Sequence, residues 1–175
     1  MNKLKQALFR LLVTLGLMAG CQTVIATAPI VKFELPKLDG TAFVRLEDYA
    51  GRPVLMNFWG SECPPCVAEM PLLFTQAQRY PEFQFLGIAV DQRAAAARFL
   101  ARMQPTYPQL IAPTQPEVLM RRFGNRVGAL PYTVMVNKQH EICASHAGEV
   151  DEKWISAAMK TCGGGVSMPP KGTNR

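Results

Sequence analysis

The stretch PVLMNFWGSECPPCVAEMP, residues 53–71, decides the fold. It opens with a continuous apolar run, residues 53–59, which is short and bounded by glycines on both sides. Such a run predicts a strand that is buried on both faces of a sheet. Two cysteines follow at once, and Pro64 stands at the start of a segment with a helical pattern, residues 63–80. The stretch therefore predicts a buried strand that leads into a Cys-x-x-Cys pair at the amino end of a helix.

The segments on either side of this stretch alternate between strand and helix patterns. Upstream we expect an extended lead-in with a turn at residues 39–40, a short strand at 41–44 and one helical turn at 46–50. Downstream we expect strands at residues 83–90, 107–111, 132–136 and 141–145, and helices at 92–103, 116–123 and 151–161. Alternation of this kind predicts an α/β three-layer sandwich, whose mixed sheet has helices on both faces and an antiparallel hairpin at one edge.

The amino-terminal segment has the pattern of a secretory signal. Residues 1–10 are basic and residues 11–20 are apolar, a run that is too short to span the bilayer alone. The run ends in LMAGC, which resembles the lipobox of bacterial lipoproteins and implies that Cys21 becomes the lipidated first residue. We therefore divide the chain into four parts, namely a signal peptide at 1–20, a linker at 21–29, one domain at 30–162 and a flexible tail at 163–175.

Two alternatives remain open for this segment. Signal peptidase could cut after Ala26, or residues 11–28 could stay as an uncleaved anchor. All three interpretations place the folded domain outside the cytoplasm, held at the membrane by lipid or by the anchor unless the segment is cut off.

The net charge of +6 comes mainly from the two ends of the chain. Without residues 1–10 and the tail, 14 basic side chains stand against 13 acidic ones. No basic patch with interleaved aromatic residues stands out, so the composition argues against nucleic acid as a partner.

The cysteine pair at residues 63 and 66 allows three interpretations, which are a zinc site, a small structural disulfide and a redox pair. Zinc would need a second pair, and a loop of two residues stabilises little. Placement after a buried strand and at the start of a helix favours the redox pair. Cys63 faces the positive end of the helix dipole, which favours the attacking thiolate, and Cys66 can resolve the mixed disulfide. Pro64 and Pro65 lack N–H groups and leave the Cys66 amide as the main donor. No histidine lies between the cysteines to add positive charge, so we predict a moderately lowered thiol pKa and a mild reductant.

Residues 57–71 resemble the active-site segment of the TlpA/ResA family of extracytoplasmic thioredoxin-like disulfide reductases. The lead-in at 33–55 and the loop GALPYT at 128–133 extend the resemblance over residues 30–162. It implies a thioredoxin-like fold and a protein-disulfide reductase that needs no cofactor. It also implies disulfide-bonded exported proteins as substrates, apocytochrome c among them, and a membrane thiol reductase of the DsbD/CcdA type as electron donor.

The same resemblance gives roles to residues around the pair. It implies a cis peptide bond at Pro131, beside the cysteines, which would turn the backbone before it toward the substrate. Glu69 lies three residues after Cys66 and is either an exposed helix residue or, as in the ResA-like branch, a group that tunes thiol acidity. Asn57 stands where cytoplasmic thioredoxins have a buried aspartate, so Glu69 is the nearer proton acceptor for Cys66. Glu62 departs from the family, which often has an aromatic residue there, and its carboxylate should raise the thiol pKa of its neighbour.

Three further features complete the set of candidates. Trp59 is either a wall of the active site or core packing, and we favour packing. If Cys21 carries lipid and Cys63 pairs with Cys66, Cys143 and Cys162 remain as a second pair. They can meet, because the strand that follows Cys143 and the helix that returns to Cys162 have similar lengths. The alternative for this pair is two buried thiols. His140, at the hairpin tip, is expected to be exposed.

Two other functions compete with disulfide reduction. A peroxidase of the related peroxiredoxin group would need a lone reactive cysteine with a nearby threonine and arginine. A non-catalytic copper-binding or structural module would use His146 with the cysteines, but copper-delivering thioredoxin-fold proteins have a wider cysteine spacing, and the nine methionines are scattered. We therefore expect no metal site and no cofactor.

Overall fold

The computed structural model describes residues 31–112 and 114–164. The predicted signal peptide, Cys21, the linker and residues 165–175 lie outside the described residues. The proposed division into a signal, a linker, one domain and a tail therefore stays a prediction. Within the described part of the chain, no helix combines the length and the apolar character that crossing a membrane requires.

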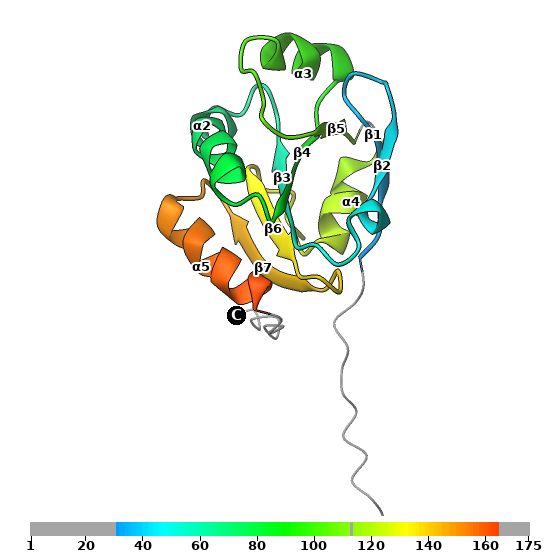
Figure 1. Ribbon diagram of the computed structural model, residues 1–175. Helices are drawn as coiled ribbons and strands as arrows, with labels where there is room; N and C mark the ends of the chain where they lie inside the picture. The colour runs from blue at the N-terminus through cyan, green and yellow to red at the C-terminus, as the bar shows by residue number, and fades with distance from the viewer. Residues whose placement is uncertain (1–30, 113, 165–175) are drawn as a thin grey trace, which may run out of the picture.

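A five-stranded mixed sheet forms the centre of the molecule (Figure 1). The elements in chain order are β1 (Glu34–Pro36), β2 (Phe43–Arg45), η1 (Leu46–Tyr49), β3 (Val54–Trp59), α2 (Pro64–Arg79), β4 (Gln84–Ala89), α3 (Arg93–Leu100), β5 (Gln109–Ile111), α4 (Pro116–Arg122), β6 (Tyr132–Val136), β7 (Ile142–Ala147) and α5 (Glu152–Gly163). The strand order is β5-β4-β3-β6-β7, in which β3, β4 and β5 run parallel and β6 is antiparallel to both of its neighbours.

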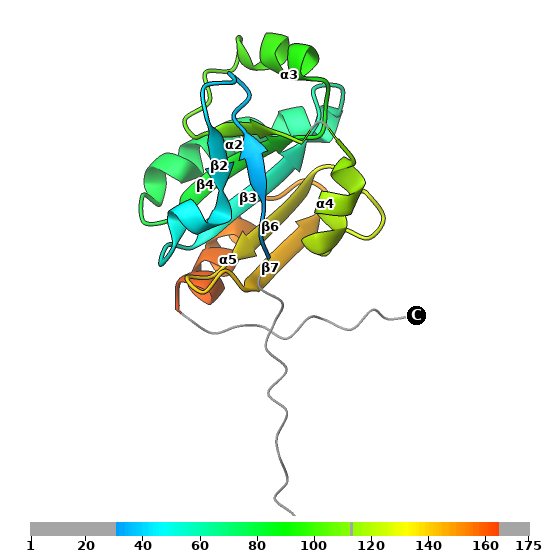
Figure 2. The same cartoon turned by 90° about the vertical axis from the view of Figure 1, so that its right-hand side faces the viewer.

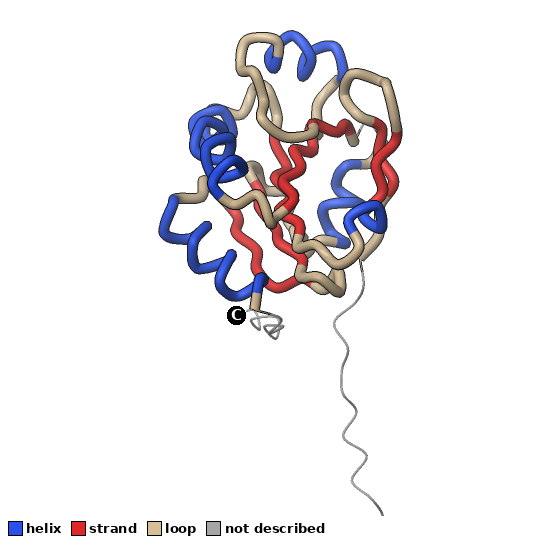
Figure 3. The backbone as a smooth tube through the Cα atoms, viewed as in Figure 1, coloured by secondary structure: helices blue, strands red, loops and turns tan. Residues whose placement is uncertain are grey.

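Helices cover the sheet on both faces. The apolar side chains of α2, α3 and α5 pack in one core layer, and those of α4, η1 and β2 pack in the other. Figure 2 shows the second face, on which α4 lies beside the β1–β2 hairpin, and Figure 3 shows the strands between the two sets of helices. The predicted α/β three-layer sandwich is confirmed.

Strand β3 is the centre of both core layers. All six of its residues are buried, because β4 and β6 flank it and helices cover its two faces. Leu55 and Trp59 point into the layer of α2, and Met56 and Phe58 point into the layer of α4. Full burial of each such side chain contributes ~1.5–3 kcal/mol relative to exposure. The burial of these side chains on both faces therefore holds β3, the strand that leads to the cysteine pair, in its position in the sheet.

The structure differs from the sequence prediction in a few places. The extended lead-in contains a strand, β1, which pairs antiparallel with β2. Helix α3 ends at Leu100, three residues early, because Met103 N bonds to the Leu100 carbonyl (3.0 Å) in a tighter turn. The expectation of an exposed His140 was wrong, since its side chain is buried with its Nε2 atom 3.4 Å from the carbonyl oxygen of Tyr49 in η1.

Candidate active site

The cysteine pair lies at the carboxyl end of β3, where the chain enters α2. Cys63 is the N-cap of the helix, and Cys66 lies in its first turn. A disulfide joins the two residues, whose Cα atoms are 5.2 Å apart. Cys63 is partly exposed, whereas Cys66 is fully buried. An incoming molecule can therefore reach the first sulfur but not the second, which is the asymmetry that an attacking and a resolving cysteine require.

The first turn of α2 directs a hydrogen bond at the exposed sulfur. Pro64 and Pro65 supply no N–H group, and the amide of Cys66 donates to the Sγ atom of Cys63 (3.3 Å). This is the donor that the sequence analysis expected the two prolines to leave. In the reduced protein, this amide and the helix dipole favour a thiolate at Cys63.

Asp91 holds the loop that carries the pair. The amide of Ser61 donates to Asp91 Oδ2 (2.7 Å), and the Ser61 hydroxyl donates to the same oxygen. Burial raises the pKa of Asp91, but the hydrogen bonds from Ser61 and Gln92 together lower it by more than burial raises it. The net pKa is therefore below the ordinary value. Asp91 was not among the site residues predicted from the sequence. Its position after the strand that runs parallel to β3 could have identified it, because the carboxyl ends of parallel strands meet at one edge of the sheet.

The loop before β6 reaches the same edge of the sheet. Tyr132 is paired with Phe58, so the residues before it continue past the carboxyl end of β3. The Leu130–Pro131 peptide bond is cis. A Cβ atom placed on Gly60 would lie 3.8 Å from Leu130 Cδ1 and 3.9 Å from Cys63 Cβ. Gly60 thus lies between the proline loop and the cysteine pair, in close contact with both.

Glu69 lies on α2 three residues after Cys66 and is buried, not exposed on the helix surface. It is 1% exposed, and its two oxygens accept hydrogen bonds from Asn57 Nδ2 (2.7 Å) and from the amide of Val150 (2.9 Å). Asn57 Nδ2 also donates to Thr133 Oγ1 (3.0 Å). Burial outweighs these donors and raises the pKa of Glu69 to about 7. A carboxyl with this pKa can both accept and release a proton near neutral pH.

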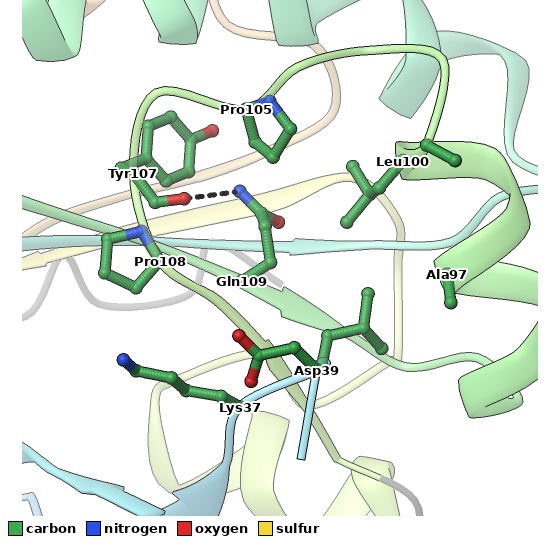
Figure 4. A pocket seen from close by; sticks show the side chains of 10 residues that line it. Lys37, Asp39, Ala97, Leu100, Pro105, Tyr107, Pro108 and Gln109 are labelled. Carbon is green, nitrogen blue, oxygen red and sulfur yellow. Dashed lines mark hydrogen bonds between the residues drawn. The ribbon is translucent and has the colours of Figure 1, made fainter. Parts of the chain in front are cut away.

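Trp59 is part of the core and does not line an open site. Its side chain is fully buried, packs against Phe99 (centroids 5.6 Å apart) and donates from Nε1 to Gln109 Oε1 (3.1 Å). Gln109 lies at a hollow of about 420 Å³ between α3, β5 and the turn after β1, where its Nε2 atom donates to the Tyr107 carbonyl (3.3 Å; Figure 4). No cysteine lines this hollow, so the cysteine chemistry takes place elsewhere.

The structure contains a second disulfide. It joins Cys143 of β7 to Cys162 of α5, with Cα atoms 5.5 Å apart, and both residues are buried. The structure therefore brings together the two cysteines that the sequence analysis paired. Glu62, next to Cys63, is exposed, and its effect on the thiol stays a prediction. Within residues 31–112 and 114–164, no three His, Cys, Asp or Glu side chains are grouped as metal ligands would be.

Known proteins are similar to this chain in sequence and in fold. The profile of the AhpC/TSA family matches residues 26–145. The thiol-disulfide oxidoreductase ResA of Geobacillus thermodenitrificans is 30% identical over 142 residues, which cover 78% of this chain and 76% of that protein. ResA of Halalkalibacterium halodurans is 29% identical over 136 residues, which cover 74% and 73%. Among solved structures, MTB dsbF in its mixed oxidized and reduced forms has a TM-score of 0.67 and 26% identity, covering 78% of this chain and all of that one.

Proposed function

This chain belongs to the AhpC/TSA family as a thiol–disulfide oxidoreductase of the ResA type, and we propose that it reduces disulfide bonds in exported proteins. One observation carries the proposal. The Cys63–Cys66 disulfide has one sulfur that a polypeptide can reach and one that is buried behind it. Disulfide-bonded proteins are the substrates that this arrangement suits, and apocytochrome c is one member of that class.

The geometry supports a two-step exchange that starts from the reduced pair. The Cys63 thiolate attacks one sulfur of the substrate disulfide, so that a mixed disulfide forms and the other substrate sulfur leaves as a thiolate. Cys66 then passes its proton to Glu69 and attacks Cys63 Sγ, which releases the second substrate sulfur. Two electrons pass from the cysteine pair to the substrate, and the protein is left with the Cys63–Cys66 disulfide. A membrane thiol reductase of the DsbD/CcdA type would reduce it again.

Insulin reduction by the reduced protein tests this mechanism. We expect Cys63→Ser to lose this activity. Cys66→Ala should accumulate mixed disulfides when it is expressed in cells, and mass spectrometry should identify the trapped partners as exported proteins. Paired substitution of Cys143 and Cys162 by alanine is the matched control and should keep the activity. A Cys63→Ser variant that still reduces insulin, or a wild-type protein that consumes peroxide but leaves insulin intact, would contradict the proposal.

We also propose that the folded domain is exported and anchored by lipid on Cys21. The support is the apolar run at residues 11–20 followed by LMAGC. The full-length protein, expressed in a bacterium, should partition into the detergent phase of a Triton X-114 extraction, and Cys21→Ser should move it to the aqueous phase. Detergent partitioning that survives the substitution would favour the uncleaved anchor instead.

A further inference from the structure

The segment at residues 124–130, hereafter the Arg126 loop, leads from α4 to the cis proline. Its last residue is Leu130. A Cβ atom placed on Gly60 would lie within van der Waals contact of both Leu130 and Cys63, so the loop ends close to the cysteine pair. The loop therefore runs along the edge of the sheet at which Cys63 is exposed. A polypeptide whose disulfide faces Cys63 has to pass this loop on one side of the attacked sulfur.

Hydrogen bonds hold the Arg126 loop in one shape. Asn125 is 2% exposed, its Oδ1 accepts from the amide of Ala129 (3.1 Å), and its Nδ2 donates to the carbonyl of Ala129 (2.7 Å). The hydroxyl of Tyr132 donates to the carbonyl of Phe123 (2.8 Å), which ties the two ends of the loop together. Gly124 supplies a positive φ of 95° where the chain leaves α4. A loop that is ordered in advance loses little entropy when it binds.

The side chains at the tip of this ordered loop point away from the core. Val127 is 86% exposed, more than any other large apolar residue in the described part of the chain. Arg126 is exposed beside it, and Arg121 and Arg122 end the preceding helix. None of the ion pairs formed among the described residues includes these three arginines. The sequence has no carboxylate between residues 117 and 141, so Arg126 has no acidic neighbour along the chain. Arg121 and Arg122 differ from it, because Glu117 lies one helical turn before Arg121, and Arg122 lines a hollow with Glu34, Glu47 and Asp48.

We propose that the Arg126 loop selects the substrates of the reductase. The occupant is a disulfide-bonded polypeptide segment with an apolar side chain that packs on Val127 and an acidic side chain that pairs with Arg126. An ordered loop with an exposed apolar residue next to an arginine has the composition of an interface, in which arginine is enriched. Glu62, which is exposed next to Cys63, repels a carboxylate, so an acidic side chain of the bound segment is favoured at Arg126 and disfavoured at Glu62. The inference rests on the proposed reduction of protein disulfides.

Three synthetic peptides test the proposal. They share one disulfide and one apolar residue and differ at a single neighbouring position, which is Asp, Asn or Lys. At low ionic strength, wild-type kcat/KM should be about three- to tenfold higher for the Asp peptide than for the Lys peptide. Arg126→Glu should invert this order, and Val127→Ser should raise KM for all three peptides. Arg98→Glu, the same charge reversal on the exposed face of α3, should leave the order unchanged.

The small neutral substrate bis(2-hydroxyethyl) disulfide distinguishes a failure of the proposed reductase activity from a failure of the proposed role of the Arg126 loop. It has no charged or bulky apolar group that could pair with Arg126 or pack on Val127, so wild type and the variants at these two positions should reduce it at the same rate. Failure of the wild-type protein to reduce it would overturn the proposed function itself. If wild type and Arg126→Glu reduce this compound equally and also have the same ratio of kcat/KM for the Asp and Lys peptides, only the proposed role of the loop is overturned. A wild-type preference that does not shrink in 0.5 M salt would also count against it, because exposed ion pairs are screened.

Discussion

Glu69 occupies a position in which ionisation is costly but not prevented. Two donors, Asn57 Nδ2 and the amide of Val150, favour the carboxylate, while nearly complete removal from water favours the neutral acid. The balance leaves the pKa at about 7, well above its ordinary value of 4.5. A carboxyl group with this pKa can accept or release a proton near neutral pH.

The raised pKa of Glu69 predicts a pH dependence of stability. Between the unfolded pKa of 4.5 and the folded pKa of about 7, the folded state binds more protons, so its stability falls as pH rises through this window. In urea unfolding of the oxidised protein, the wild type should lose up to about 3 kcal/mol more between pH 5 and pH 8 than Glu69→Gln does. The glutamine variant should be less stable at pH 5, since its NH₂ group faces a donor.

Glu117→Gln is the matched control, because the same change is made on an exposed residue of α4. It should leave the pH profile of the wild type unchanged. Equal slopes for wild type and Glu69→Gln would show that Glu69 is ionised in the folded state over the whole range, and the proposed proton transfer from Cys66 would lose its acceptor.

At the scale of elements, a glycine in β4 makes room for a side chain of β5. Gln109 crosses over Gly87, where a Cβ atom would lie 2.0 Å from its Oε1 atom. The glycine therefore permits the hydrogen bond from Trp59 Nε1 to Gln109. Three adjacent strands are linked in this way, and the link holds the end of β3 from which the cysteine loop departs.

Gly87→Ala should displace Gln109 and leave the buried Trp59 N–H without its acceptor. We expect a loss of about 1–3 kcal/mol in the free energy of unfolding and a shift in tryptophan emission. The control is a double-mutant cycle, since Gly87→Ala should cost much less in a Gln109→Ala background. Additive losses would mean that the alanine acts elsewhere.

The elements that sequence predicted well are those whose pattern is complete within one segment. The apolar run of β3 and the Cys-Pro-Pro-Cys start of α2 are of this kind. Strand β1 has only three residues, and its identity depends on pairing with β2. The burial of His140 depends on η1, which is ninety residues away in the chain. Likewise, the sequence left Glu69 between an exposed and a functional position, because Val150, eighty-one residues later, supplies one of its partners.

At the scale of the whole molecule, the Cys143–Cys162 disulfide joins the last strand to the last helix. Val150, whose amide donates to Glu69, lies two residues before the start of α5 and within the segment that this disulfide closes. The closed segment therefore also contributes to the active site. The bridge lies in the same core layer as Trp59 and Cys66, and both of its cysteines are at most 2% exposed. Burial protects it from the thiols that exchange with Cys63, so the two disulfides can have separate roles.

Removal of this bridge should lower stability without removing the chemistry. The two cysteines are 19 residues apart, and a loop of this length predicts a loss of about 3 kcal/mol in the free energy of unfolding when both become alanine. Cys63→Ala with Cys66→Ala removes a bridge between residues only three positions apart and should cost about half as much. Urea unfolding at pH 5, where Glu69 is neutral in the folded state, measures both without the titration of that group. A loss below 1 kcal/mol for the first pair would mean that α5 docks on the sheet through its apolar face alone, and the disulfide would then need a role other than stability.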